Sequence, residues 1–158
     1  MKQILFFIFL SVFTHQAYPQ HQKRFLRFFL HQRSEMYIQS EQIRFTNEDI
    51  GLIRNEMNLS GPDSTRLLNA SVQVMTKKAL LGDSSFYLDM KQYEEMLKHD
   101  RLITVLMVSK PVLIEGGSLM IIKADMYCGS KCGEGLIYVY KREGKNYKLV
   151  KALQAWIS

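Results

Sequence analysis

The chain has 158 residues, of which 47% are hydrophobic, and a formal net charge of +6 at pH 7. The length fits one domain with a sizeable core. The positive charge is mild, and most basic residues alternate with acidic ones. Outside 21–33, the sequence therefore lacks the basic stripe with interleaved aromatic residues that is typical of a nucleic-acid-binding protein, and we expect no nucleic-acid partner.

The first twenty residues have the three parts of a secretory signal peptide. Lys2 supplies the positive start, the run Ile4 to Phe13 is apolar apart from one serine, and Thr14 to Gln20 is polar. The apolar run is far shorter than the roughly 20 residues of a transmembrane helix. The alternative is an N-terminal helix buried in a cytoplasmic core. We expect 1–20 to be a cleaved signal peptide and 21–158 a single α+β domain, periplasmic or secreted, without a transmembrane anchor.

Basic and aromatic residues are interleaved from His21 to Arg33 in the segment HQKRFLRFFLHQR. In a helix, Phe25, Phe28 and Phe29 would share one face. That face could lie on a membrane surface. We favour the other interpretation, in which this is the first helix of the domain and its aromatic side chains pack into the core.

The next segments also read as helices. Thr46 followed by acidic residues is typical of a helix start, and apolar residues recur at helical spacing up to Met57. Asn58 to Pro62 is expected to end this helix, because glycine and proline interrupt it. Residues 63–83 fit either a loose helix or a strand, so both remain open. Asp89 to His99 has the pattern of a short amphipathic helix.

From Arg101 onward the periodicity changes to that of strands. The expected strands are Leu102–Val108, Val112–Ile114, Leu119–Tyr127, Leu136–Tyr140 and Tyr147–Ile157. In the third of these, the even-numbered residues from Met120 to Met126 share a core face, while Lys123 and Asp125 mark the other.

Short polar turns join the last three expected strands. Leu136 to Tyr140 is apolar on both faces, as a central strand would be. Leu149, Leu153 and Ile157 recur at even spacing in the last strand. The predicted fold class is therefore α+β, with N-terminal helices packed on a C-terminal antiparallel β-meander.

Cys128 and Cys132 are the only cysteines of the chain. An even number of cysteines in an exported protein favours a disulfide. Gly129, Gly133 and Gly135 allow the positive φ angles that so tight a ring needs. On the chain-entropy model, so short a ring contributes about 2 kcal/mol, so the bond would staple a turn. A redox-active pair, a metal site and two free thiols remain as alternatives.

Catalytic motifs are not found in the sequence. A thioredoxin-type site has two residues between its cysteines at a helix start, whereas three intervene here. A zinc site needs two more ligands, and His99 stands alone. Glu94 and Glu95 are adjacent, so on a helix they point in different directions. No nucleophile elbow, metalloprotease helix or phosphate-binding loop is present. We predict no catalytic residue, no metal and no cofactor.

The end of the chain carries a resemblance. Ser109-Lys110-Pro111, the pattern C-G-x-x-C-G-x-G from Cys128 to Gly135, Gly144-Lys145 and the terminal Trp156-Ile157-Ser158 form its motifs. In these the chain resembles an uncharacterised group of small exported proteins from Bacteroidetes-type bacteria, and Thr46 to Met57 is similar to a helical motif of that group. The resemblance implies periplasmic or secreted placement and implies no activity.

Two classes of function remain open. The first is a non-enzymatic binding or structural module of the envelope or the secreted space, whose partner would be a protein, a peptide or an envelope component. Its expected interaction loop consists of Gly129, Ser130, Lys131, Gly133, Glu134 and Gly135, with Trp156 nearby. The second is a thiol-disulfide redox protein that uses Cys128 and Cys132. The sequence favours the first, because it requires no missing motif.

Overall fold

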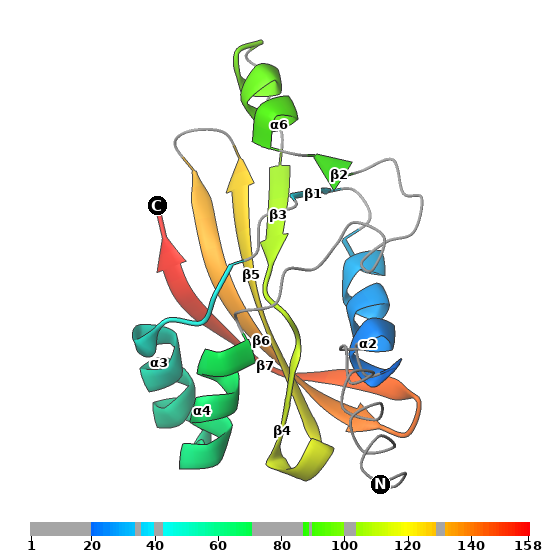
Figure 1. The fold of residues 1–158 in the computed structure, drawn as a ribbon, viewed down its shortest axis with the longest axis vertical. Coiled ribbons are helices and arrows are strands. Elements are labelled where there is room, and N and C mark those ends of the chain that lie inside the picture. Colours follow the sequence, from blue (N-terminus) through cyan, green and yellow to red (C-terminus); the bar gives the residue numbers. More distant parts are fainter. Residues whose placement is uncertain are drawn as a thin grey trace, which may run out of the picture.

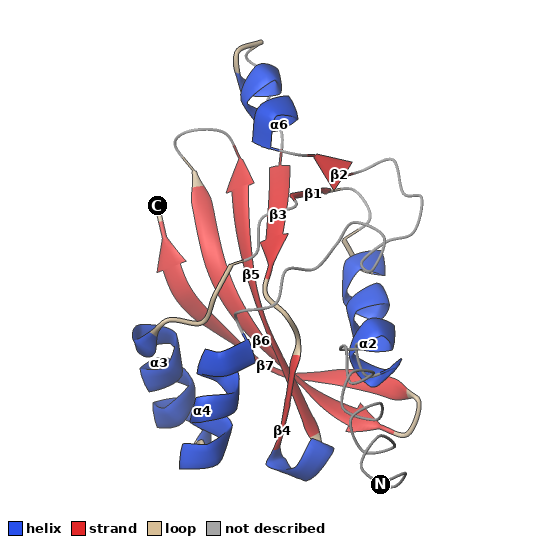
Figure 2. Cartoon of the chain, viewed as in Figure 1, coloured by secondary structure: helices blue, strands red, loops and turns tan. Residues whose placement is uncertain are grey.

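The computed structural model describes residues 20–33, 36–39, 43–70, 87–88, 90–99, 104–128 and 132–158. They form helices packed on one seven-stranded sheet (Figures 1 and 2). The fold is therefore α+β, as the sequence predicts. The expected signal peptide, residues 1–20, lies outside the described residues except for Gln20, which begins the first helix.

The described helices are α2 (Gln20–His31), α3 (Asn47–Met57), α4 (Gly61–Asn69) and α6 (Met90–Leu97), with a 3₁₀ turn at Glu115–Gly117. The strands are β1 (Tyr37–Gln39), β2 (Tyr87–Leu88), β3 (Thr104–Val108), β4 (Val112–Ile114), β5 (Leu119–Cys128), β6 (Gly133–Glu143) and β7 (Asn146–Ile157). The helix expected near Asp89 to His99 is present as α6. Of the segment left open, 63–69 is helical in α4, and 71–83 lies outside the described residues.

The strand order of the sheet is β2-β1-β3-β5-β6-β7, and β4 pairs with the first part of β5. The predicted antiparallel meander is formed by β5, β6 and β7. β3 and β4 both run antiparallel to β5 and occupy successive stretches of the same edge. β1 is parallel to both of its neighbours, β2 and β3, and the sequence does not predict this short parallel addition.

Helices cover both faces of the sheet. α2 packs on one face, and α3 and α4 pack on the other (Figure 1). Phe25 and Phe29 of α2 are fully buried and contact Tyr140 and other residues of the sheet. The predicted packing of the aromatic side chains into the core is confirmed. The alternative, in which this aromatic face lies on a membrane, is wrong because the sheet already covers the face.

α3 begins where its local sequence predicts. The Thr46 hydroxyl accepts a hydrogen bond from the Asp49 N–H at 3.1 Å, and the Asp49 carboxylate accepts one from the Thr46 N–H at 2.7 Å. Asn58 ends the helix in the left-handed conformation, with φ at 52°. Gly61 and Pro62, expected to end this helix, instead lie in the first turn of α4, where proline is tolerated.

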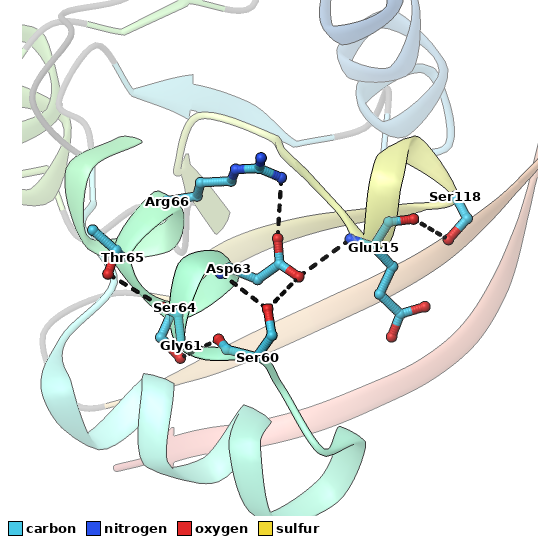
Figure 3. A network of polar contacts seen from close by, with 8 residues as sticks. All are labelled: Ser60, Gly61, Asp63, Ser64, Thr65, Arg66, Glu115 and Ser118. Atoms are coloured by element: carbon cyan, nitrogen blue, oxygen red, sulfur yellow. Dashed lines mark hydrogen bonds and ion pairs between the residues drawn. The ribbon is translucent and has the colours of Figure 1, made fainter.

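A buried carboxylate fixes the start of α4 (Figure 3). One oxygen of Asp63 accepts hydrogen bonds from the Ser60 hydroxyl at 2.8 Å and from the Glu115 N–H at 3.4 Å. Its other oxygen pairs with Arg66 at 3.2 Å. The bond to Glu115 ties the first turn of α4 to the turn that precedes β5, far along the chain.

β7 departs from the expected alternation. Leu153 is buried, but Leu149 is 48% exposed and Ile157 is 72% exposed. The register against β6 shifts twice, once between Gly135 and Leu136 and once between Val139 and Tyr140. Each bulge adds a residue to one strand and turns the following side chains to the opposite face. The three residues therefore do not share a core face.

The second face of β5 is also buried, which corrects the expectation that only the even-numbered face belongs to the core. Lys123 and Asp125 are each 6% exposed. The Lys123 ammonium lies 2.8 Å from the Asp49 carboxylate of α3. The Lys123 N–H also donates to the Ser109 hydroxyl at 2.9 Å. Burying an isolated charge costs free energy. The pairing of Lys123 with Asp49 offsets that cost where α3 packs on the sheet.

Neutralising Asp49 is expected to destabilise the protein far more than neutralising an exposed partner on the same helix. Asp49→Asn removes the carboxylate that pairs directly with the buried Lys123 ammonium, and we expect a loss of about 3 kcal/mol in the free energy of unfolding. Glu56→Gln removes the partner of Lys151, in an exposed pair worth about 1 kcal/mol or less. Urea denaturation measures both. Equal losses would contradict the assigned role of the buried pair.

Candidate functional site

A disulfide joins Cys128, the last residue of β5, to Cys132, which directly precedes β6. Their Cα atoms lie 5.3 Å apart, and the Cys128 N–H donates to the Cys132 carbonyl at 3.0 Å. The predicted disulfide thus closes the connection between two neighbouring strands. Gly129, Ser130 and Lys131 of the expected interaction loop lie outside the described residues.

Trp156 lies against the two glycines at the start of β6. Gly135 is opposite Trp156 in the β6–β7 ladder. A Cβ atom on Gly135 would stand 2.0 Å from the indole Nε1, and one on Gly133 would stand 2.9 Å from the indole Cη2. A strand glycine often marks the close approach of another group, here a large side chain. The structure therefore brings Trp156 next to Gly133 and Gly135 of the predicted loop. Glu134, between these glycines, lines an open recess at the same end of the sheet.

The indole also reaches a buried carboxylate. Trp156 Nε1–H donates to Asp125 Oδ1 at 3.1 Å, and the Tyr127 ring centroid lies 5.4 Å from that of Trp156. Burial raises the pKa of Asp125 above its ordinary value, and the nearby Asp49 charge acts in the same direction. The Lys123 charge and the indole hydrogen bond oppose that rise. Asp125, Lys123 and Asp49 thus form one electrostatic unit beneath Trp156.

An open recess of about 320 Å³ lies at this end of the sheet. Its wall is mainly apolar, with a few polar groups at the ends of β3 and β7. The lining residues are Thr104, Met126, Tyr127, Cys128, Cys132, Gly133, Glu134, Ile157 and Ser158. Ligand pockets in proteins start at about 300 Å³ and are mostly apolar with a few polar groups. The recess has room for a small apolar group.

The C-terminal residues form one wall of the recess. The Ser158 N–H donates to the Gly133 carbonyl at 3.0 Å, which holds the end of β7 beside the start of β6. Ile157 extends from this anchored strand into solvent. Ile157 thus adds an exposed apolar side chain to the mainly apolar wall of the recess.

The other candidate residues lie elsewhere. Glu94 and Glu95 are exposed on α6, and His99 is exposed just after it. Within the described ranges, no group of three or more His, Cys, Asp or Glu side chains could hold a metal ion. None of the helices in these ranges has the length and hydrophobicity of a membrane-spanning segment.

The sequence did not indicate most of the residues around the recess and around the Asp125 carboxylate. Lys123 and Asp125 alternate with apolar residues, which is the usual pattern of a solvent face. Lys123 contacts Asp49 of α3 and Asp125 contacts Trp156 of β7, both of which are distant in sequence. One local signal was available: the pair Gly133 and Gly135 within a strand indicates that a large side chain approaches closely, and the chain has a single tryptophan.

No protein-family model, curated protein or solved structure matches the chain. The geometry of this end of the sheet therefore carries the functional conclusion.

A side chain at Gly135 is expected to displace Trp156. In Gly135→Ala the new Cβ overlaps the indole and also lies 2.7 Å from Asp125 Oδ1, so we expect a loss of about 1 to 3 kcal/mol in stability. Trp156 is the only tryptophan, so a red shift of its fluorescence reports the displacement. Gly51→Ala in α3 is the control, because its Cβ meets nothing within 4 Å. Unchanged fluorescence in Gly135→Ala would contradict the assigned contact.

The raised pKa of Asp125 predicts a pH dependence of stability. The folded protein holds the Asp125 proton to higher pH than the unfolded chain, whose value is 3.8. Stability from this group is present at low pH and is lost as pH rises from about 3.8 through the raised folded pKa. Asp125→Asn retains an oxygen acceptor for Trp156 and cannot titrate. The stability of the wild type relative to this variant should therefore fall across that interval.

Urea denaturation of both proteins at a series of pH values measures that difference. A difference that stays constant, or that grows in favour of the wild type as pH rises, would show that the ionised form of Asp125 is not disfavoured by folding.

Proposed function

We propose that the chain is an exported, non-enzymatic binding module that takes an apolar side chain of a protein or envelope partner into the recess beside Cys128 and Cys132. The observation that carries this proposal is the open, mainly apolar recess itself. Strand ends form it, and the disulfide is part of its wall. The apolar segment Ile4 to Phe13 and the disulfide support export.

The surroundings of the recess favour binding over chemistry. Its wall combines Met126, Tyr127 and Ile157 with one carboxylate side chain, that of Glu134. The buried Lys123 is engaged in an ion pair with Asp49 of α3. General acid-base chemistry needs a titratable group that can reach a substrate. An apolar group entering the recess needs only the removal of water.

The redox alternative has weaker structural support. Reactive cysteine pairs gain thiolate character from a helix N-terminus or a neighbouring cation. Here Cys132 leads directly into β6 and not into a helix. The disulfide fits better as a staple that holds the wall of the recess.

Removing the exposed apolar group at the rim should weaken binding. We expect Ile157→Ser to lower the affinity for the uncharged apolar probe N-phenyl-1-naphthylamine at least about threefold, because Ile157 lines the recess. Leu149→Ser is the matched control: Leu149 is also exposed on β7 but lies outside the lining. Fluorescence titration measures both affinities.

Equal effects of the two substitutions, or no probe binding by the wild type, would contradict the recess as a binding site. Catalysed reduction of insulin disulfides, abolished in Cys132→Ser, would instead establish the thiol-disulfide alternative at Cys128 and Cys132.

A further inference from the structure

The two faces of α2 differ sharply. The aromatic face is buried in the core, as described above. The opposite face exposes Lys23, Arg24 and Arg27, and His31 follows one turn later. The sequence from Gln20 to Arg33 contains no Asp or Glu, so no acid within the helix balances these cations.

The β6–β7 turn extends this cationic face. Tyr147 of β7 donates a hydrogen bond from its hydroxyl to the His21 carbonyl at 3.1 Å, and its ring centroid lies 4.9 Å from that of Phe25. The contact fixes the hairpin against α2 (Figure 1). Arg142 and the exposed Lys145 of the hairpin therefore lie on the same side of the molecule as α2.

Electrostatics at Tyr147 support the same placement. Burial raises the pKa of the Tyr147 hydroxyl, while the charges of Arg142 and Arg24 lower it. Cations from the helix and from the hairpin thus both act on one phenol. We call Lys23, Arg24, Arg27, Arg142 and Lys145 the basic surface.

Few carboxylates neutralise the cations of the basic surface. The ion pairs among the described residues join Asp63 to Arg66, Asp49 to Lys123 and Glu56 to Lys151, and none includes a cation of the basic surface. Glu143, at the hairpin, is the nearest acid in sequence and leaves the surface with a net positive charge. Clustered cations without carboxylate partners attract a multiply charged anion.

We propose that the basic surface docks the protein onto an anionic phospholipid membrane. A membrane offers a dense array of phosphate groups, and each Lys or Arg held within a Debye length of it adds to the attraction. Because the aromatic side of α2 is buried, the helix adsorbs through its charges and does not insert. Single-stranded nucleic acid fits less well, since stacking on its bases requires exposed aromatic side chains and Phe25 and Phe29 are inside the core.

The position of the basic surface suits such docking. The β6–β7 turn lies at one end of the sheet, and the end of β5 and the start of β6 lie at the other (Figure 1). β6 has 11 residues, which at the rise of a strand span about 35 Å. A molecule docked through the basic surface would therefore hold the recess away from the membrane, accessible to a partner.

Vesicle co-sedimentation tests the proposal with the purified chain. The vesicles are pure phosphatidylcholine, or a mixture with phosphatidylglycerol; the neutral set gives the baseline for any binding by the apolar segment Ile4 to Phe13. We expect binding to the anionic vesicles in excess of this baseline. The excess should disappear when NaCl rises from about 0.1 M to about 1 M, which shortens the Debye length from about 10 Å to about 3 Å.

Three exposed residues of α2 provide the decisive variant. Lys23→Gln, Arg24→Gln and Arg27→Gln combined should lower the partition onto anionic vesicles at least about tenfold. The charge-conserving combination Lys23→Arg, Arg24→Lys and Arg27→Lys should retain it, which distinguishes lost charge from a damaged helix.

A matched variant removes the same charge elsewhere. Arg44, Lys91 and Lys98 are exposed and lie outside α2 and the hairpin. Their combined replacement by Gln should change the partition by less than about twofold. Equal loss in both variants, no excess binding to anionic vesicles, or tighter binding to a DNA duplex at equal phosphate concentration would overturn the proposal. None of these outcomes depends on the recess, so the proposed binding module is tested separately.

Discussion

Strand β5 is covered by helices on both faces, and the ion pair between Lys123 and Asp49 makes that burial possible. Even-numbered residues of β5 face α2, while odd-numbered residues face α3 and α4. Lys123 is therefore almost fully buried and needs an internal anion. Asp49 supplies it from the first turn of α3, where the same carboxylate also completes the helix cap. One side chain thus fixes both the start of α3 and its position on the sheet.

The buried odd-numbered face of β5 continues to the end of the sheet that holds the recess. Asp125 follows Lys123 on the same face and receives a hydrogen bond from Trp156. The indole covers two glycines of β6, whose missing side chains leave the space that it fills. Glycine weakens a strand, and contact with a large aromatic side chain offsets that weakness. The backbone around the recess is consequently held by packing and hydrogen bonds as well as by the disulfide.

Local signals account for what the sequence predicts well. The cap at Thr46, the aromatic stripe from Phe25 to Phe29 and the turns between the late strands are short-range patterns, and the structure has a helix or a turn at each of them. The failures are long-range. β1 and β2 are too short to show a period, and their parallel pairing joins distant segments. Lys123 is paired with a helix residue and Asp125 with Trp156 of the last strand, and both partners are distant in sequence. The exposure of Leu149 follows a bulge that no local pattern encodes.

The disulfide is compatible with a binding function, but the recess does not depend on the disulfide alone. Its ring joins only the adjacent ends of β5 and β6, whereas the recess also has walls from β3 and from the end of β7. Those walls are held by the antiparallel ladders and by the Ser158 hydrogen bond to Gly133. So short a cross-link constrains the unfolded chain little, and its effect is local. The bond therefore shapes the rim of a site whose remaining walls belong to the sheet, which is what a structural disulfide at a binding surface requires.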